Sequence, residues 1–283
     1  MCGRTLAVLE DGRAVLLRGC SKPGASALRW ARAMTDAELN QRLLTNVIAF
    51  KHLQRERGLL VHWGRPGLDA FALPGHPAEA HFQQAYFEDV GALEAGLPAL
   101  RDFYRSQGVG SWRVAVTPGQ EAGVPLLKAA GYHPDNRLPG MGLALADVAD
   151  APPRLPLERP ETQDALVDLN IRVWGKWDDI LTVWKRPPAL PVHTLVAREH
   201  GAPLACGFAL DVGDTAGVYM VVTAPEARGR GLASEVMKGL LSGARERGMA
   251  ASVLQATEEG RGVYRRLGYR ELGDLENWVY RAR

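Results

Sequence analysis

The sequence predicts an α+β fold that is repeated twice along one chain. Its 283 residues are 46% hydrophobic and 23% charged, an ordinary globular composition with material for roughly two domains. Segments with a helical period alternate with short runs typical of strands. One order of elements recurs after a proline-rich stretch at 147–160. We therefore expect two domains, 1–150 and 155–283, each a mixed, mostly antiparallel twisted sheet flanked by helices.

The first half begins with a long helix. Thr35 and Glu38 have the spacing of a capping box, and apolar residues follow at helical period until a stop near Gly58. A second helix contains Pro98, which would weaken its interior unless it lay in the first turn. The other expected elements are, in order, a possible strand at 81–87, this second helix with Leu93, Leu97, Leu100 and Tyr104 on one face, a strand at 112–117, and a short helix at 124–130 closed by Gly131.

The second half repeats this plan after the linker expected at 147–160. Its expected elements are, in order, helices at 164–173 and 180–184, strands at 193–198, 204–212 and 217–222, a helix from 233 to 247, a strand at 251–256 and a short helix at 260–267.

An internal repeat supports this reading. At an offset of 137, Gly123 and Gly131 fall on Gly260 and Gly268, and the aromatic Tyr132 falls on Tyr269. The longer helix that precedes these residues in each half aligns only when the offset is increased by three residues, to 140. Helix–glycine–aromatic endings are common, so chance similarity is the alternative, but the shared order of elements favours a duplication.

Charge and cysteine content exclude several classes of protein. A formal net charge of +2 predicts neither a nucleic-acid nor a membrane partner, so any anion site has to come from a local cluster. Cys2, Cys20 and Cys206 follow no disulfide or zinc spacing, and neither HExxH nor CxxC occurs. No stretch approaches the ~20 apolar residues of a membrane span. We expect a cytoplasmic protein without a metal ion.

The strongest local motif is the run from Arg228 to Ala233, which opens a helix after a strand. A helix amino terminus exposes unpaired amides and the positive end of the helix dipole. Gly229 and Gly231 let a diphosphate approach the main chain, and Arg228 and Arg230 add charge. A solvated turn that caps a helix is the alternative. The P-loop string is absent, and Ser234 stands where a dinucleotide fingerprint needs a third glycine.

The motif and its context resemble the GNAT superfamily of acyl-CoA N-acyltransferases. Arg228, Gly231 and Ala233 match the family signature Arg/Gln-x-x-Gly-x-Gly/Ala. The segment from Thr257 to Tyr269 is similar to the family's Asn-x-x-Ala-x-x-Leu-Tyr-x-x-x-Gly-Phe at the right distance. Thr257 replaces the usual Asn, and Gly260 replaces the usual Ala. The resemblance covers roughly 155–283.

This resemblance implies an activity and a set of site residues. The chain would move an acetyl group from acetyl-CoA to a primary amine by direct attack, and the alternative is a non-catalytic CoA-binding sensor or assembly module. Tyr264 would donate a proton to the departing thiolate; the alternative is a half-buried aromatic residue on a short helix. The implied CoA-binding residues are Met220, Val221 and Val222 for the pantetheine arm, Arg228, Gly229, Arg230, Gly231, Leu232 and Ala233 for the pyrophosphate, and the polar Thr257.

Other candidate catalytic side chains are weaker. Asp211 and Asp214 precede a strand and could act as a base through water, but both are typical turn formers. Cys206 has no histidine partner implied by the sequence and is expected to be a core residue.

The first copy lacks the expected chemistry. Glu88 and Asp89 occupy the position of the diphosphate loop, where two carboxylates would repel the ligand, and Leu127 stands at the position of Tyr264. The resemblance therefore implies a degenerate amino-terminal copy.

The acceptor is expected to be a small-molecule or peptide amine. Trp174, Trp177 and Trp184 lie in the segment that lines the acceptor pocket in the family, and Asp178 and Asp179 add negative charge suited to a cation. A core cluster or a contact between the copies is an equal alternative for the tryptophans. The sequence identifies neither the amine, nor the acyl-chain preference, nor the oligomeric state.

Overall fold

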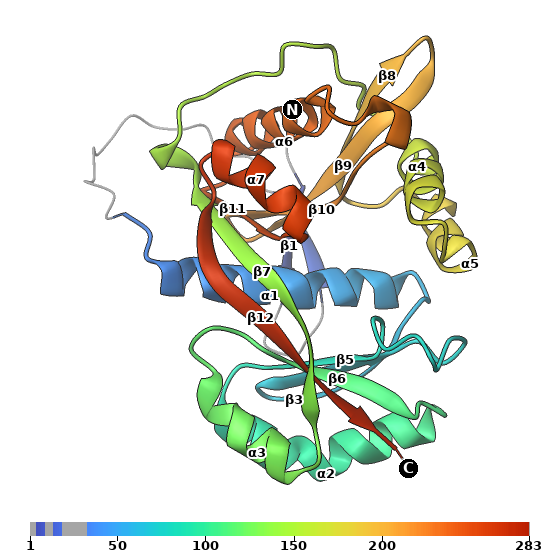
Figure 1. The fold of residues 1–283 in the computed structure, drawn as a ribbon, viewed down its shortest axis with the longest axis vertical. Coiled ribbons are helices and arrows are strands. Elements are labelled where there is room, and N and C mark those ends of the chain that lie inside the picture. The colour runs from blue at the N-terminus through green and yellow to red at the C-terminus, as the bar shows by residue number, and fades with distance from the viewer. Residues whose placement is uncertain (1–3, 9–13, 19–32, 283) are drawn as a thin grey trace. The chain divides into compact units, whose positions relative to one another are not determined.

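A computed structural model describes residues 4–8, 14–18 and 33–282, and the chain divides into two compact units (Figure 1). Unit 1 comprises Met1–Asn46 and Met141–Glu271, and unit 2 comprises Val47–Gly140 and Leu272–Arg283. Each unit therefore takes a segment from both of the predicted ranges 1–150 and 155–283. Cys2 and Cys20 lie outside the described residues. No helix among the described residues is long and apolar enough to cross a membrane.

Unit 1 is built on a mixed sheet in the order β2-β1-β9-β10-β11-β7, and β8 pairs with β9. The β8–β9 and β9–β10 pairs are antiparallel, and the β10–β11 pair is parallel. Its strands are β1 Arg4–Val8, β2 Ala14–Arg18, β8 His193–Glu199, β9 Ala202–Val212, β10 Thr215–Thr223, β11 Ala251–Gln255 and the end of β7 His133–Ala144. Its helices are the start of α1 Asp36–Glu56, α4 Asp164–Trp174, α5 Asp178–Leu181, α6 Leu232–Glu246 and α7 Glu258–Arg266.

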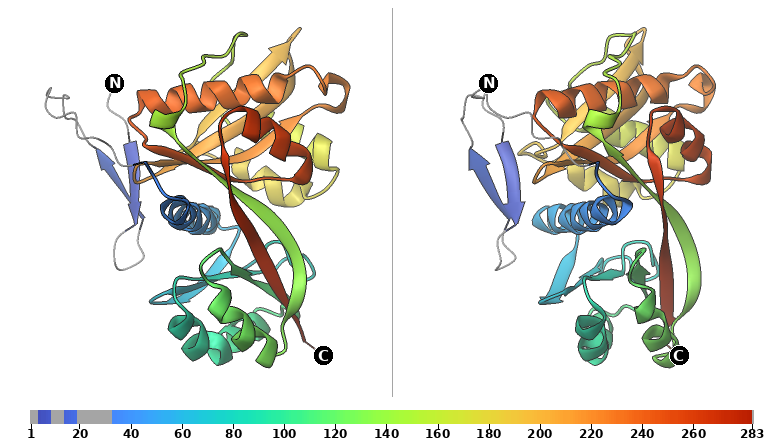
Figure 2. Two further views of the ribbon diagram at one scale, coloured as in Figure 1. Left: turned by 60° about the vertical axis from the view of Figure 1, so that its left-hand side comes forward. Right: turned by 90° about the vertical axis from the view of Figure 1, so that its left-hand side faces the viewer.

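Helices α4 and α6 cover opposite faces of this sheet (Figure 2). Cys206 of β9 contacts Asn170 of α4, whereas Leu195 of β8 lies against Gly239 of α6. Leu195 pairs with Gly207, the next residue after Cys206, so these contacts lie on alternate sides of the pleat. A Cβ on Gly239 would lie 2.7 Å from Leu195, so this glycine allows α6 to pack closely on the strand.

Unit 2 has a mixed sheet in the order β7-β12-β6-β5-β4-β3. Among the pairs from β12 to β3, only β5–β6 is parallel. Its strands are β3 Val61–Arg65, β4 Leu68–Ala72, β5 Gln84–Phe87, β6 Ser111–Val116, most of β7 and most of β12 Arg270–Arg281, and its complete helices are α2 Val90–Ser106 and α3 Val124–Ala129. In both units the mixed, mostly antiparallel pairing agrees with the predicted fold class.

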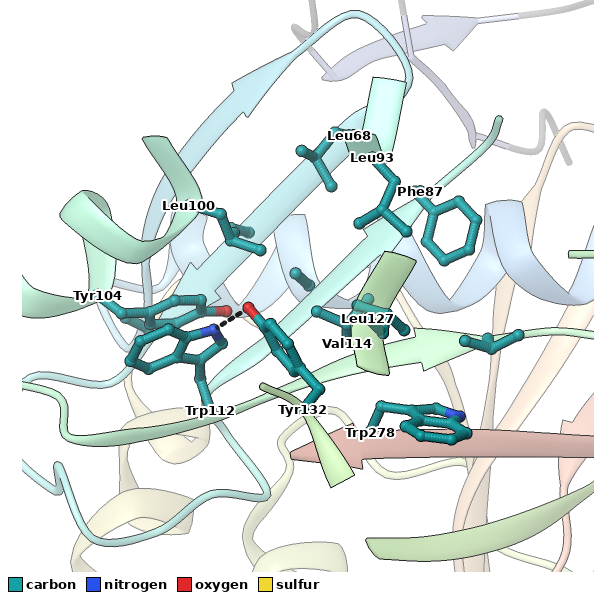
Figure 3. Packing of buried hydrophobic residues seen from close by; sticks show 14 of the residues in the cluster. Leu68, Phe87, Leu93, Leu100, Tyr104, Trp112, Val114, Leu127, Tyr132 and Trp278 are labelled. Carbon is teal, nitrogen blue, oxygen red and sulfur yellow. Dashed lines mark hydrogen bonds between the residues drawn. The ribbon is translucent and has the colours of Figure 1, made fainter. Parts of the chain in front are cut away.

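The core of unit 2 is dense in aromatic side chains (Figure 3). Trp112 stacks on Tyr104 with ring centroids 4.8 Å apart, and its indole donates a hydrogen bond of 2.8 Å to the Tyr132 hydroxyl. Leu127 is fully buried in the same cluster. Since a buried indole N–H needs a partner, the Trp112–Tyr132 contact fixes the orientation of both rings.

The closing strands of both halves of the chain, β7 and β12, lie mostly in unit 2. In unit 2, β12 pairs antiparallel with β6, with Glu276 opposite Val116. In unit 1, the chain leaving β7 remains attached because the Leu145 amide donates a hydrogen bond of 2.9 Å to the Ala250 carbonyl.

The capping box at the start of α1 is confirmed. The Thr35 amide donates to the Glu38 carboxylate at 2.7 Å, and the Glu38 amide donates to the Thr35 hydroxyl at 3.2 Å. The helix expected around Pro98 is present, and α2 continues through this proline, which lies beyond the first turn. Pro98 and Glu94 are both exposed, so water can satisfy the carbonyl that loses its amide partner. The hairpins β1–β2 and β3–β4 were not predicted.

Candidate ligand-binding and catalytic site

The loop before α6 presents bare main chain to open space. Gly229 and Gly231 have φ values of +77° and +78°, in the left-handed region that favours glycine. A Cβ built on either residue would meet no atom within 4 Å. The sequence therefore has glycine where the turn requires it, and the absent side chains leave room for a ligand.

The amino terminus of α6 has no side-chain cap. Gly231 occupies the N-cap position and makes no capping hydrogen bond. Among the described residues, no hydrogen bond involves the backbone amides of residues 229–234. By contrast, Thr257 caps α7 and Asp89 caps α2 with their own side chains. Free amides at the positive end of a 15-residue helix fit a bound anion such as a diphosphate.

The two arginines of this loop differ in their surroundings. Arg230 makes a bidentate ion pair with Glu199 of β8, with nitrogen–oxygen distances of 3.0 and 2.6 Å. Hydrogen bonds from Arg230 lower the pKa of the Glu199 carboxyl, so the pair stays charged at neutral pH. Arg228 is exposed and makes no ion pair with any residue that the structure describes. Arg228 therefore supplies the uncompensated positive charge of the loop.

Strand β10 turns away from β11 close to this loop. The two strands pair only from Thr215 and Ala251 to Gly217 and Val253. Beyond that point β10 pairs with β9 alone, and the register is irregular between Tyr219 and Val222. The predicted pantetheine-binding strand is therefore unpaired on its β11 side, where main-chain groups are free to bond a ligand.

Met220, Val221 and Val222 lie within this irregular part of β10. Met220 has a φ of +53°, which is unusual for a residue with a side chain. A Cβ on Gly207 of β9 would lie 2.9 Å from Val221 Cγ2, so the Val221 side chain packs across the strand onto that glycine. Val222 is buried, and Met220 and Val221 are half-buried.

Asn170 is a site residue that the sequence analysis missed. It is fully buried on α4 and donates to the Leu166 carbonyl at 2.8 Å and to the Met220 carbonyl at 3.4 Å. Its Oδ1 has no hydrogen-bond partner within the described part of the chain. The available signal was a polar residue on the buried stripe of an amphipathic helix. Asn170 holds the irregular segment of β10 and offers a free acceptor beside it.

Tyr264 lies half-buried on α7, with its ring centroid 5.9 Å from that of Tyr269. Burial raises the pKa of the Tyr264 hydroxyl to about 12, so the group is protonated at neutral pH. No described residue forms a hydrogen bond with this hydroxyl. A Cβ on Gly260 would lie 3.0 Å from Cε2 of the ring, so glycine at this position lets the ring lie against the helix.

Thr257 is exposed and begins α7. Its hydroxyl oxygen accepts a hydrogen bond of 3.1 Å from the Gly260 amide. The oxygen is therefore engaged in capping, while the hydroxyl hydrogen remains available to donate.

The weaker catalytic candidates are engaged in structural contacts. Burial would raise the pKa of Asp211, but hydrogen bonds from His193 and Arg247 outweigh this effect and lower it. Asp214 is held by Arg42, whose Nη2 donates to Oδ2 at 3.1 Å. Cys206 is fully buried, and burial raises the pKa of its thiol to about 12. The expectation that Cys206 is a core residue is confirmed.

The three tryptophans of the predicted acceptor segment separate in the structure. Trp184 is buried against Phe208 at a centroid distance of 5.8 Å. Trp174 and Trp177 form an edge-to-face pair at 5.6 Å, and Trp174 is 36% exposed. Asp178 and Asp179 are both exposed at the start of α5. Trp184 is therefore a core residue, while the other two belong to an aromatic part of the surface that carries Asp178, Asp179 and Lys176, whose Nζ lies 3.9 Å from the centroid of the Trp177 ring.

The residues of the first half that correspond to the candidate site are Asp89 at the loop before α2, Gln120 at the position of Thr257, and Leu127 at the position of Tyr264. They make different contacts. Asp89 Oδ1 accepts a hydrogen bond of 2.8 Å from the Ala92 amide, so the start of α2 is already capped. Gln120 accepts from the Thr117 amide at 2.9 Å and donates to the Phe87 carbonyl, and thereby links the ends of β5 and β6. Leu127 points into the core.

Comparison with protein families matches residues 191–272 to the acetyltransferase (GNAT) domain. This segment contains β10, the loop before α6, and Tyr264. Comparison with curated proteins finds no match. Residues 191–272 are therefore similar to the acetyltransferase (GNAT) domain.

Three solved structures with similar folds have names that include GNAT or GCN5-related N-acetyltransferase. A GCN5-related N-acetyltransferase from Kribbella flavida has a TM-score of 0.61 at 15% identity, covering 88% of this chain and 96% of that one. A tandem GNAT protein from the clavulanic acid biosynthesis pathway has a TM-score of 0.59 at 15% identity, covering 76% and 78%. A GCN5-related N-acetyltransferase from Sphaerobacter thermophilus has a TM-score of 0.50 at 13% identity, covering 76% and 80%. At these identities the likeness establishes the fold alone.

Proposed function

We propose, from the GNAT acetyltransferase domain at residues 191–272, that the chain transfers an acetyl group from acetyl-CoA to a primary amine. The observation that carries this proposal is the uncapped start of α6, where two left-handed glycines face open space beside the unpaired edge of β10. The amides of residues 229–234 would bind the diphosphate, and Arg228 would add a charge-assisted contact. The main chain of Met220, Val221 and Val222 would bond the pantetheine arm.

The chemistry would be a direct attack of the neutral amine on the thioester carbonyl. A carbon–nitrogen bond forms, and the resulting oxyanion collapses as the carbon–sulfur bond breaks. Tyr264 would donate its hydroxyl proton to the departing CoA thiolate. The amine proton leaves to solvent, because Asp211 and Asp214 are both held by arginines, and the Tyr264 phenolate regains a proton from solvent before the next turnover. With its pKa raised to about 12 by burial, Tyr264 remains a proton donor throughout the neutral range.

The repeat would give the enzyme one working copy and one degenerate copy. Strand β12 covers the residues of β7 shifted by 137. The Tyr132 hydroxyl meets Trp112, the second residue of β6, just as the Tyr269 hydroxyl meets Ser252, the second residue of β11, at 2.6 Å. These equivalent contacts support a duplication. The capping by Asp89 and the burial of Leu127 support the loss of CoA binding in the first copy.

A cationic amine, on a small molecule or a peptide, is the acceptor that the surface around α5 favours. Asp178 and Asp179 are exposed there, next to the Trp174–Trp177 pair. Carboxylates attract an ammonium group, and aromatic faces stabilise it further. We place the reaction in the cytoplasm, where acetyl-CoA would be supplied.

Calorimetry with acetyl-CoA tests the binding part of this proposal. We expect about one site per chain, and we expect Arg228→Glu to weaken binding at least 10-fold, because an uncompensated charge at the diphosphate is reversed. The control is Arg105→Glu, a change at an exposed arginine of α2. Two sites per chain would contradict a degenerate first copy, and equal effects of the two variants would contradict the placement of the diphosphate.

Acetylation of a panel of primary amines tests the chemical part. We expect Tyr264→Phe to lower kcat about 100-fold, the lower range for loss of a general acid, with an unchanged Kd for CoA. The wild-type rate should show no decline between about pH 7 and 10, since the hydroxyl titrates only near 12. CoA binding without transfer to any amine in the wild-type protein would favour the non-catalytic sensor or assembly module instead.

A further inference from the structure

Two histidines and a carboxylate of unit 2 come together away from the proposed CoA site. His52 lies on α1, His62 on β3 and Asp69 on β4. Each offers one metal-ligand atom, and these three atoms all lie within 4.8 Å of one another. His62 Nε2 is 2.7 Å from Asp69 Oδ1, and His52 Nε2 is 3.8 Å from the same oxygen.

The β3–β4 hairpin fixes two of the three side chains. His62 pairs with Phe71, and Gly64 pairs with Asp69, so the four residues lie on one face of the hairpin because side chains alternate along a strand. The Phe71 ring contacts both imidazoles, with centroid distances of 5.0 Å to His52 and 4.9 Å to His62. An apolar support of this kind holds the two rings beside the carboxylate.

Gly64 is the position that gives this cluster its space. A Cβ on Gly64 would lie 2.9 Å from His62 Nε2 and 3.0 Å from Asp69 Oδ1. Gly64 does not have a positive φ, so the backbone conformation does not require glycine there. Glycine inside a strand often marks a place where another group approaches closely. Here the groups that approach the glycine are the side chains of His62 and Asp69.

A simple histidine–aspartate hydrogen bond explains only part of the arrangement. It accounts for His62 and Asp69, whose 2.7 Å contact is an ordinary hydrogen bond. It does not account for His52, whose side chain is 8% exposed. His52 Nδ1 has no partner among the described residues, and the 3.8 Å from its Nε2 to Asp69 exceeds hydrogen-bonding distance. An ion bound at Nε2 would account for the position of the His52 ring beside the carboxylate.

We propose that His52, His62 and Asp69 bind a divalent transition-metal ion of the zinc type, with water completing the coordination. Two imidazole nitrogens and one carboxylate oxygen are donors that Zn²⁺ prefers. Metal–ligand bonds of about 2.0–2.2 Å in a tetrahedron place ligand atoms roughly 3.3 Å apart. The present distances of 2.7 and 3.8 Å lie on either side of that value. His62 and Asp69 are 20% and 26% exposed, which gives the ion access from solvent.

Such an ion would tie the end of α1 to the β3–β4 hairpin. His52 lies four residues before the end of the helix, whereas its partners lie on adjacent strands. Since a metal that binds only the folded state stabilises that state, the expected consequence is higher stability of unit 2. The proposal does not depend on the acyl-transfer reaction, because its residues lie outside the GNAT segment at 191–272.

Zn²⁺ titration of chelator-treated full-length protein tests the proposal by calorimetry. We expect about one Zn²⁺ per chain and a rise in Tm of roughly 5–10 °C at a Zn²⁺ concentration 100 times the Kd. His62→Ala and Asp69→Asn should each weaken binding at least 10-fold. His133→Ala is the control, because His133 is an exposed histidine of the same unit. Gly64→Ala should also weaken binding, since its methyl group would crowd His62 and Asp69.

Co²⁺ absorption provides a second measurement that does not depend on any variant. Binding in the wild-type protein should produce visible bands that Zn²⁺ abolishes. Failure of the wild-type protein to bind either ion would overturn the proposal. So would Zn²⁺ binding that His62→Ala and Asp69→Asn leave intact while circular dichroism shows both variants folded. Loss of binding in His133→Ala would point to an adventitious surface site and would refute the assignment as well.

Discussion

Replacing Gly231 by alanine separates the cost of backbone strain from the cost of blocking the anion site. Gly231 precedes α6 with φ +78°, and Gly248 follows the same helix with φ +80°. A Cβ on either residue would meet no atom within 4 Å. Alanine at each position therefore carries the same penalty, the left-handed conformation, which costs about 1–2 kcal/mol. Gly248→Ala is a matched control at the opposite end of the helix.

The two variants should be equally destabilised and should differ only in ligand binding. Urea denaturation without ligand should lower the free energy of unfolding by about 1–2 kcal/mol in both. Calorimetry with acetyl-CoA should give at least a 10-fold higher Kd for Gly231→Ala, equivalent to about 1.4 kcal/mol, because the methyl group would stand where a diphosphate meets the free amides. The Kd of Gly248→Ala should stay within about twofold of the wild type.

Equal Kd values for the two variants would refute this reasoning, because the left-handed glycine at Gly231 would then serve the turn alone. A much larger loss of stability in Gly231→Ala than in Gly248→Ala would also count against it. That result would mean that the methyl group meets protein atoms and not the open space seen in the structure.

Three further predictions concern unit 1. Gly217→Ala should lower the free energy of unfolding by about 3–5 kcal/mol, because its methyl group would overlap the buried Asn46 carboxamide and break that group's hydrogen bonds. Urea denaturation measures this loss, and the double variant with Asn46→Ala should recover part of it. The pKa of Asp211 is lower in the folded state than in the unfolded state, so the ionised carboxylate stabilises the fold at neutral pH, and this stabilisation is lost as the pH falls through the folded-state pKa. The difference in the free energy of unfolding between wild type and Asp211→Asn should therefore shrink below about pH 4. A difference that stays unchanged in acid would contradict this. Cys206, in a variant lacking the other two cysteines, should resist thiol reagents until urea unfolds the protein, since burial raises the pKa of its thiol to about 12; rapid labelling of the folded variant would be contrary evidence.

Local signals predicted most of the helices and several strands. The Thr35–Glu38 capping box predicted the start of α1, and the reciprocal hydrogen bonds are present. Gly131 was predicted to end α3, and it has a φ of +86° immediately after that helix. Such signals succeed because helix ends and tight turns depend on residues within one or two turns of the chain.

The missed elements had weaker or overlooked signals. Asp11–Gly12 stands between the apolar runs that become β1 and β2, and this dipeptide is a recognised hairpin signal. The β3–β4 hairpin lies in a stretch where glycine and proline suggested irregular structure. Pro98 lowered the expectation for α2, although its exposed position makes the lost hydrogen bond tolerable.

By itself the sequence determined the glycine-rich loop before a helix and the residues that resemble an acyl-CoA site, because such motifs depend on close spacing. Only the tertiary structure decided how charges and strands pair. It neutralises Arg230 through Glu199, while Arg228 has no ion-pair partner among the described residues. It also joins β12 to β6 and brings His52 to His62 and Asp69, which lie 10 and 17 residues further along the chain. These contacts depend on which distant surfaces pack together, and no local periodicity encodes that choice.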